Sequence, residues 1–116
     1  MADDKLTLRA SQAGMRFIAQ MTIYNSGDFE PLRTYVAESY HPQLLVEHSA
    51  EEWLGEFREW QQDAGKVKVQ QVVGASKHQV VVLLASERAD DFWLCDLTVE
   101  EDYPHRITQY LVMVME

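Results

Sequence analysis

The spacing of hydrophobic residues changes at Lys66, and this change constrains the fold more than any other feature of the chain. Before Lys66, apolar residues recur every three or four positions, as on one face of an amphipathic helix. From Lys66 onward they alternate with polar residues, which is typical of half-buried strands. Because the helical and extended patterns are segregated along the chain, we expect an α+β domain with its helices packed on an antiparallel sheet.

The helical half predicts three N-terminal helices. The first begins within residues 6–11 and runs to about Tyr24, after which Gly27 can adopt the positive φ of a helix end. Asp28 is suited to cap a second, shorter helix, which ends before Pro42.

A serine followed three residues later by a glutamate marks the third helix. Ser49 and Glu52 match the capping box, in which each side chain accepts a hydrogen bond from the other residue's backbone N–H. This helix runs to about Ala64, and Gly65 ends it. The apolar run 44–46, which precedes it, is interpreted as a short edge strand.

Four extended segments follow, at about 66–75, 80–88, 92–100 and 106–115. Short connections between consecutive strands predict an antiparallel meander, so we expect a curved sheet of four strands and of no more than six. With 116 residues the chain can build one core, and residues 1–116 are expected to form a single domain.

A two-residue turn at 89–90 sets the expected register, because it pairs Val82 with Leu97. Placing Ile107 beside Val99 fixes the last strand. The inner face, which we expect the helices to cover, then consists of Val67, Val69, Gln71, Val73, Val80, Val82, Leu84, Trp93, Cys95, Leu97, Val99, Ile107, Leu111 and Met113.

The opposite, outer face is unusually apolar for a sheet covered on one side only, because a solvated face should carry polar residues. The residues expected there are Val72, Val81, Leu83, Phe92, Leu94, Val112 and Val114, with Tyr110 beside Asp96. Exposed apolar patches of this kind usually mark an interface. We therefore expect a homodimer through the outer sheet face, the alternative being a partner domain or a longer chain that covers it.

Two local motifs carry a resemblance to a known superfamily. Tyr24-Asn25-Ser26-Gly27-Asp28 resembles its N-x-G-D junction between the first helices, and Tyr103-Pro104-His105-Arg106-Ile107 resembles its proline-led entry into the last strand. This is the cone-shaped α+β superfamily of ketosteroid isomerase, scytalone dehydratase, nuclear transport factor two (NTF2) and the polyketide-cyclase-like (SnoaL-like) domains. The resemblance implies a cone-like fold over nearly the whole chain.

The same superfamily contains enzymes, binding modules and scaffolds, so the resemblance implies no single function. The chain also resembles cone domains that are attached to serine hydrolases and have no nucleophile of their own.

In such cones the space between the helices and the inner sheet face can form a pocket. The residues expected to line it are Gln71, Gln109, Ser86 and Arg88 as polar groups, with Tyr35, Trp53, Phe57 and Met21 as walls. Two amides in such a pocket would suit a small, largely neutral ligand. The alternative is that the glutamines are core residues bonded to backbone or water.

The expected pocket contains no carboxylate in the middle of a strand, although general acid–base chemistry needs a group with a tuned pKa. Asp96 is expected on the outer face. A one-residue slip of the register would bring Asp96 and Tyr110 inside, as a base and a phenol donor. Our first hypothesis is therefore a non-enzymatic, homodimeric domain that binds a small apolar ligand or acts as an accessory or scaffold module. The alternative is an isomerase, dehydratase or hydrolase that uses Asp96 and Tyr110.

Charge and side-chain chemistry argue against several partners. The formal net charge of −9 repels nucleic acids and anionic membranes, and we expect neither as a partner. The four histidines lack metal-ligand spacing, so we expect no metal, and no motif predicts a cofactor. The single cysteine, Cys95, is expected to be a small buried hydrophobe in a reducing cytoplasm.

Overall fold

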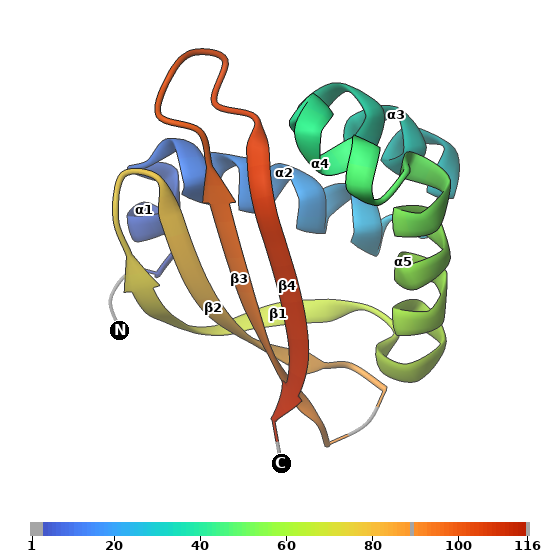
Figure 1. Ribbon diagram of the computed structural model, residues 1–116. Helices are drawn as coiled ribbons and strands as arrows, with labels where there is room; N and C mark the ends of the chain where they lie inside the picture. Colours follow the sequence, from blue (N-terminus) through green and yellow to red (C-terminus); the bar gives the residue numbers. More distant parts are fainter. Residues whose placement is uncertain (1–3, 89, 116) are drawn as a thin grey trace.

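A computed structural model describes residues 4–88 and 90–115 of the chain (Figure 1). The helices come first: α1 (Asp4–Arg9), α2 (Gln12–Asn25), α3 (Phe29–Ser39), α4 (Pro42–Glu47) and α5 (Ala50–Ala64). The strands follow: β1 (Val67–Ala75), β2 (Gln79–Ser86), β3 (Phe92–Val99) and β4 (Ile107–Met115). The α+β class with segregated helices and strands, predicted from the change of period, is confirmed.

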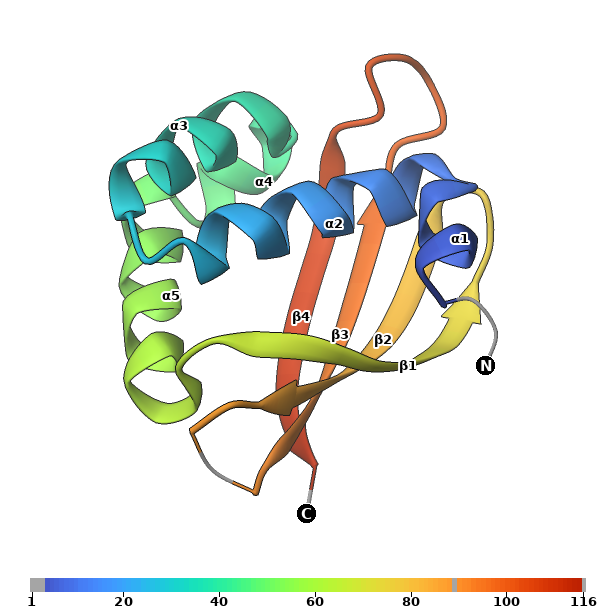
Figure 2. The same cartoon turned by 180° about the vertical axis from the view of Figure 1, so that it is seen from behind.

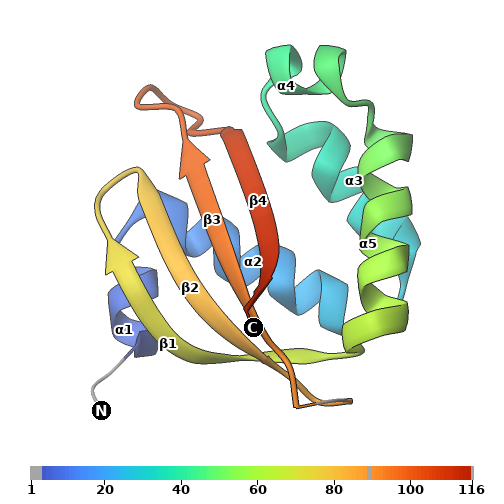
Figure 3. The same cartoon turned by 60° about the horizontal axis from the view of Figure 1, so that its bottom comes forward.

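The helices cover the two halves of the inner sheet face differently. Helix α2 runs across β1, β2 and β3, with α1 beside β1 (Figure 2). Helix α5 instead packs against α3 and stands apart from the strands on the β4 side (Figures 1 and 3). The inner face is therefore closely covered over β1–β3 and less closely covered along β4.

Two predictions for the helical half need correction. The expected first helix is two helices, because Ser11 caps α2 by accepting a hydrogen bond from the Gly14 N–H at 2.9 Å. A Cβ on Gly14 would lie 1.8 Å from the Leu8 carbonyl oxygen, so only glycine permits this corner. The run 44–46 belongs to α4 and not to a strand, because His41 caps that helix and Pro42 suits its first turn.

The capping box of α5 is confirmed. The Ser49 hydroxyl accepts from the Glu52 N–H at 3.2 Å, and the Glu52 carboxylate accepts from the Ser49 N–H at 2.8 Å. At the other end Gly65 has a φ of +65°, as predicted for a helix terminator.

The sheet has four antiparallel strands in the order β1-β2-β3-β4, as predicted. The register between β2 and β3 differs by two residues from the expected one, because Val82 pairs with Cys95 and not with Leu97. The connection is longer than expected, because the Ser86 N–H donates to the Asp91 carbonyl, whereas the predicted turn pairs Arg88 with Asp91. A shift of two preserves the faces, so β2 and β3 present the predicted residues inward. The turn expected at 89–90 includes Ala89, which lies outside the described residues.

Bulges exchange the faces of parts of β1 and β4. The register of β1 shifts between Val69 and Gln71, and again between Val72 and Gly74. On β4 the shift lies between Ile107 and Gln109, which pair with Val99 and Thr98. An extra residue in one strand turns every following side chain to the other face until a second bulge restores the alternation.

The outer-face prediction is therefore correct for Val81, Leu83, Phe92 and Leu94 and wrong for Val72, Tyr110, Val112 and Val114, which pair with inner-face residues. Leu111, Met113 and Met115 take their places outside, paired with Asp96, Leu94 and Phe92. The outer face remains largely apolar, although some of the residues that form it differ from those predicted.

No helix among the described residues is long and apolar enough to cross a membrane.

Candidate functional site

A cleft of about 530 Å³ lies between α5 and the β3–β4 edge of the sheet. Helix α5 contributes Trp53, Phe57 and Trp60, whose spacing of four and three residues places them on one face of the helix. The sheet contributes Trp93, Tyr110, Leu111 and Val112 from β3 and β4, and the remaining lining residues are His48, Glu56, Glu59 and Asp63.

Five aromatic side chains form the walls of this cleft. Across it, the rings of Phe57 and Tyr110 stack at 5.9 Å and 22°, while Trp60 and Trp93 meet edge-on at 5.8 Å and 78°. Trp53 lies 6.2 Å from Tyr110. Such offset and edge-to-face arrangements are favourable for aromatic pairs and keep the rings in fixed positions.

The indole nitrogens of the three tryptophans have no hydrogen-bond partner among the described residues. Trp53 and Trp60 are only 8% and 7% exposed, so their N–H groups are also shut off from bulk water. A buried donor without a partner is costly, and most proteins avoid it. Three such donors around one cleft call for an explanation that the packing of the chain does not supply.

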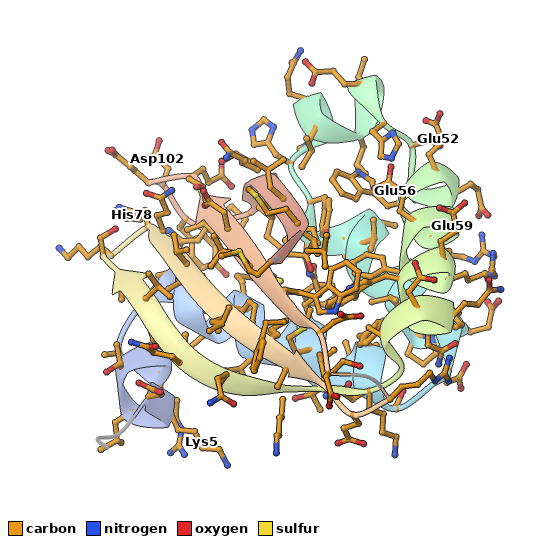
Figure 4. All side chains as sticks on the ribbon, turned by 90° about the horizontal axis from the view of Figure 1, so that it is seen from below. Lys5, Glu52, Glu56, Glu59, His78 and Asp102 are labelled. Atoms are coloured by element: carbon orange, nitrogen blue, oxygen red, sulfur yellow. The ribbon has the colours of Figure 1, made fainter. Side chains whose placement is uncertain are left out.

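The rim of the cleft is acidic. Glu56, Glu59 and Asp63 project from α5, and no lysine or arginine is among the described residues that line the cleft. Figure 4 shows Glu52, Glu56 and Glu59 along this helix. The imidazole Nε2 of His48 lies 2.7 Å from the Glu56 carboxylate, and its ring meets Trp53 edge-on at 4.7 Å.

Tyr110 lines the cleft and contacts the buried thiol of Cys95 behind it, and both groups are kept in their neutral forms. The Tyr110 hydroxyl lies 3.7 Å from the Cys95 sulfur. Burial raises the pKa of Cys95 to about 12, and burial also raises the pKa of Tyr110 well above its usual value. Cys95 is therefore a buried thiol, as expected, and not an activated nucleophile.

Of the residues predicted to line a pocket, Trp53 and Phe57 do so. Gln71 and Gln109 do not, because the bulges turn both side chains to the outer face, where they are exposed. The pair of amides expected to hold a neutral ligand is thus absent from the cleft.

The other four predicted pocket residues have structural contacts elsewhere. Ser86 and Arg88 bond to carbonyls at the C-terminal end of α5. The Tyr35 hydroxyl donates to the Arg16 carbonyl at 2.8 Å and so joins α3 to α2. Met21 is buried in the core, beside a groove between α2 and β1.

Asp96 and Tyr110 lie on opposite faces of the sheet. Asp96 is outward, as the first register predicts, and its carboxylate accepts a hydrogen bond from the Gln79 amide at 3.0 Å. Tyr110 is inward, as only the slipped register predicts. The two cannot act together on one substrate, which removes the geometric basis of the catalytic alternative.

The sequence-based reasoning missed Trp93, Glu56, Glu59 and Asp63 as lining residues. A signal was present, because acidic residues at 56, 59 and 63 recur with the three-to-four spacing of a helix face. The histidines outside the cleft form no metal site: His78 and His105 stack at 6.1 Å near Asp102, on the side of the molecule away from α5 (Figure 4). No group of three potential metal ligands occurs in residues 4–88 and 90–115.

The fold and the cleft define an α+β domain with an aromatic, acid-rimmed cleft. Comparisons with protein-family models, curated protein sequences and solved structures found no match to the chain.

Proposed function

We propose that this chain is a non-enzymatic domain that binds a small ligand in the cleft between α5 and β4. The observation that carries the proposal is the concentration of five aromatic rings around one cavity of about 530 Å³. Cavities of this size with mostly apolar walls and few polar groups are the usual form of small-molecule sites.

A binding role fits the chemistry of the cleft better than a catalytic role. Its inner wall offers the neutral phenol of Tyr110, and its carboxylates stand at the solvent-exposed rim. A general base works best with a pKa tuned by burial, and no carboxylate of the cleft is buried. The helix-covered sheet is also compatible with a cone-like, NTF2-like domain, a superfamily that includes non-catalytic binding modules.

Intrinsic tryptophan fluorescence tests the proposal directly, because all three tryptophans of the chain line the cleft. Apolar and aromatic compounds are screened by thermal shift, and hits are titrated against fluorescence excited at 295 nm. Ligand binding should raise the melting temperature with ligand concentration and change the tryptophan emission.

A pair of matched variants locates the bound ligand. Val112→Phe adds a ring to the cleft wall and should weaken binding about tenfold or more, whereas Val73→Phe makes the same change at an exposed position on β1. If no compound stabilises the protein, or if both variants bind equally well, the cleft is not a ligand site and a purely structural domain is favoured.

We also propose that two copies pair through the outer sheet face. Seven apolar residues occupy it: Val81, Leu83, Phe92, Leu94, Leu111, Met113 and Met115. Four of these, Phe92, Leu111, Met113 and Met115, are more than two fifths exposed. The charged residues among the described pairs of this face are Lys68 and Asp96, which have opposite signs. A second copy therefore offers both an apolar and an oppositely charged surface.

The mass in solution tests the pairing. Sedimentation at micromolar concentration should give the mass of two chains, and Leu111→Glu/Met113→Lys, which alters two exposed side chains, should give one. A mass of one chain for the unaltered protein would contradict the dimer without affecting the ligand-binding proposal.

A further inference from the structure

We infer that the cleft selects a cationic ligand with a flat or apolar body, such as an aromatic amine. This inference rests on the proposed ligand-binding function and names the chemical class of the ligand. It departs from the neutral ligand that the sequence suggests, because the two glutamines on which that expectation depended are outside the cleft.

The side chains that line the cleft carry a negative charge. Glu56, Glu59 and Asp63 contribute three carboxylates, and no lysine or arginine accompanies them among the described lining residues. The formal net charge of −9 adds a long-range field of the same sign. A cation is attracted to this rim, whereas an anion of the same shape is repelled.

The walls of the cleft behind this acidic rim are aromatic. The same cavity is lined by five aromatic rings, those of Trp53, Phe57, Trp60, Trp93 and Tyr110. Aromatic faces attract cations, tryptophan most strongly, and clusters of such rings are a known way to hold substituted ammonium groups. An apolar cation can satisfy both surfaces at once, with its body against the rings and its charge at the rim.

The imidazole of His48 already contacts both an aromatic ring and a carboxylate of the cleft. Its imidazole packs edge-on against Trp53 at 4.7 Å while Nε2 lies 2.7 Å from the Glu56 carboxylate. A small nitrogen heterocycle is thus held between an indole and an acid at the mouth of the cleft. A ligand amine could make the same pair of contacts with an aromatic ring and the rim carboxylates of Glu59 and Asp63.

The test compares three probes of similar size and different charge: 2-phenylethylamine (cation), 2-phenylethanol (neutral) and 3-phenylpropionate (anion). Each is titrated against tryptophan fluorescence at pH 7. The amine should bind about tenfold more tightly than the alcohol, and the carboxylate more weakly than both. Raising the salt concentration should reduce the preference for the amine, because the rim carboxylates are exposed.

Two triple variants that change the net charge equally distinguish the effect of the rim carboxylates from the effect of the overall charge of the chain. Glu56→Gln/Glu59→Gln/Asp63→Asn should abolish the preference for the amine while binding of the alcohol persists, which also reports an intact cleft. Glu38→Gln/Glu87→Gln/Glu101→Gln removes three exposed acids outside the cleft and should retain most of the preference.

The possible failures are distinguishable. If the alcohol or the carboxylate binds as tightly as the amine, or if both triple variants behave alike, the inference is overturned and ligand binding stands. If the three probes fail but the apolar screen yields a ligand, the inference is again overturned. If the screen also yields none, the proposed function fails, and the inference fails with it.

Discussion

The two halves of the inner sheet face are built from similar residues but are completed differently. Over β1–β3, α2 closes the core, and the Tyr24 hydroxyl near its end donates to the Gly65 carbonyl at 2.7 Å, although the buried Gln20 Nε2 on the same helix has no partner among the described residues. Beside β3 and β4, α5 stands away from the strands, and no described residue is a hydrogen-bond partner for the indole N–H groups of Trp53, Trp60 and Trp93. Aromatic residues in this chain therefore both fill the core and form the walls of an open cleft.

Large-to-small substitutions in the two halves should have unequal costs. Phe17 on α2 is 1% exposed, and Phe17→Ala should lower the free energy of unfolding by about 4 kcal/mol, because it removes an almost completely buried ring. Trp93→Ala should cost less than about 2 kcal/mol although it removes a larger ring, because this half-buried side chain borders a space that is already open.

Urea unfolding monitored by circular dichroism measures both losses, since it does not depend on the tryptophan that is removed. Equal losses would mean that the cleft is as tightly packed as the core, which would contradict the distinction between the two halves.

A side chain that ties a helix to a strand is present in the covered half. The Asn25 amide donates to the Val67 carbonyl at 2.8 Å and accepts from the Val67 N–H at 2.9 Å, which joins the end of α2 to the start of β1. Asn25→Ala should therefore lower the free energy of unfolding by about 2 kcal/mol, roughly 1 kcal/mol for each lost hydrogen bond.

Thr22→Ala, an exposed change on the same helix, should cost less than about 0.5 kcal/mol. If Asn25→Ala is as mild as this control, the link does not stabilise the covered half. The affinity of the cleft for the probes should be unchanged in both variants.

The sequence predicted the two halves with unequal success, and the reason lies in single residues. Strands β2 and β3 pair without a bulge, so their faces are correct even though the register between them is shifted by two. In β1 and β4, apolar residues are separated by three positions, at Val69–Val72 and Ile107–Tyr110, and both spacings coincide with bulges. A spacing of three between apolar residues indicates a bulge, whereas the predicted register keeps inward and outward side chains in strict alternation along both strands.

The candidate site was only partly predictable for the same reason. Trp53 and Phe57 were expected from the helical spacing of α5, which depends on local sequence. Gln71 and Gln109 depended on the sheet register and were placed on the wrong face. The existence of the cleft depends on how far α5 stands from β4, which is a property of tertiary packing that no local pattern encodes.

The capping box contributes more to the stability of α5 because this helix has few contacts with the sheet. Glu52 makes the contribution of the capping box dependent on pH. The hydrogen bond from the Ser49 N–H to the carboxylate lowers the pKa of Glu52 below its usual value of 4.5. A carboxylate with a depressed pKa in the folded state stabilises the fold above the unfolded-state pKa, and the contribution disappears as the pH falls through the folded-state value.

Glu52→Gln keeps an acceptor for the Ser49 N–H but cannot titrate, so it separates the charge from the cap. Wild type should be slightly more stable than Glu52→Gln at pH 7, and the difference should shrink below pH 4.5 as the carboxylate becomes protonated. Urea midpoints for both proteins between pH 7 and pH 3 measure this small effect. A difference that stays constant or grows in acid would show that the ionised carboxylate does not stabilise the helix that forms the outer wall of the cleft.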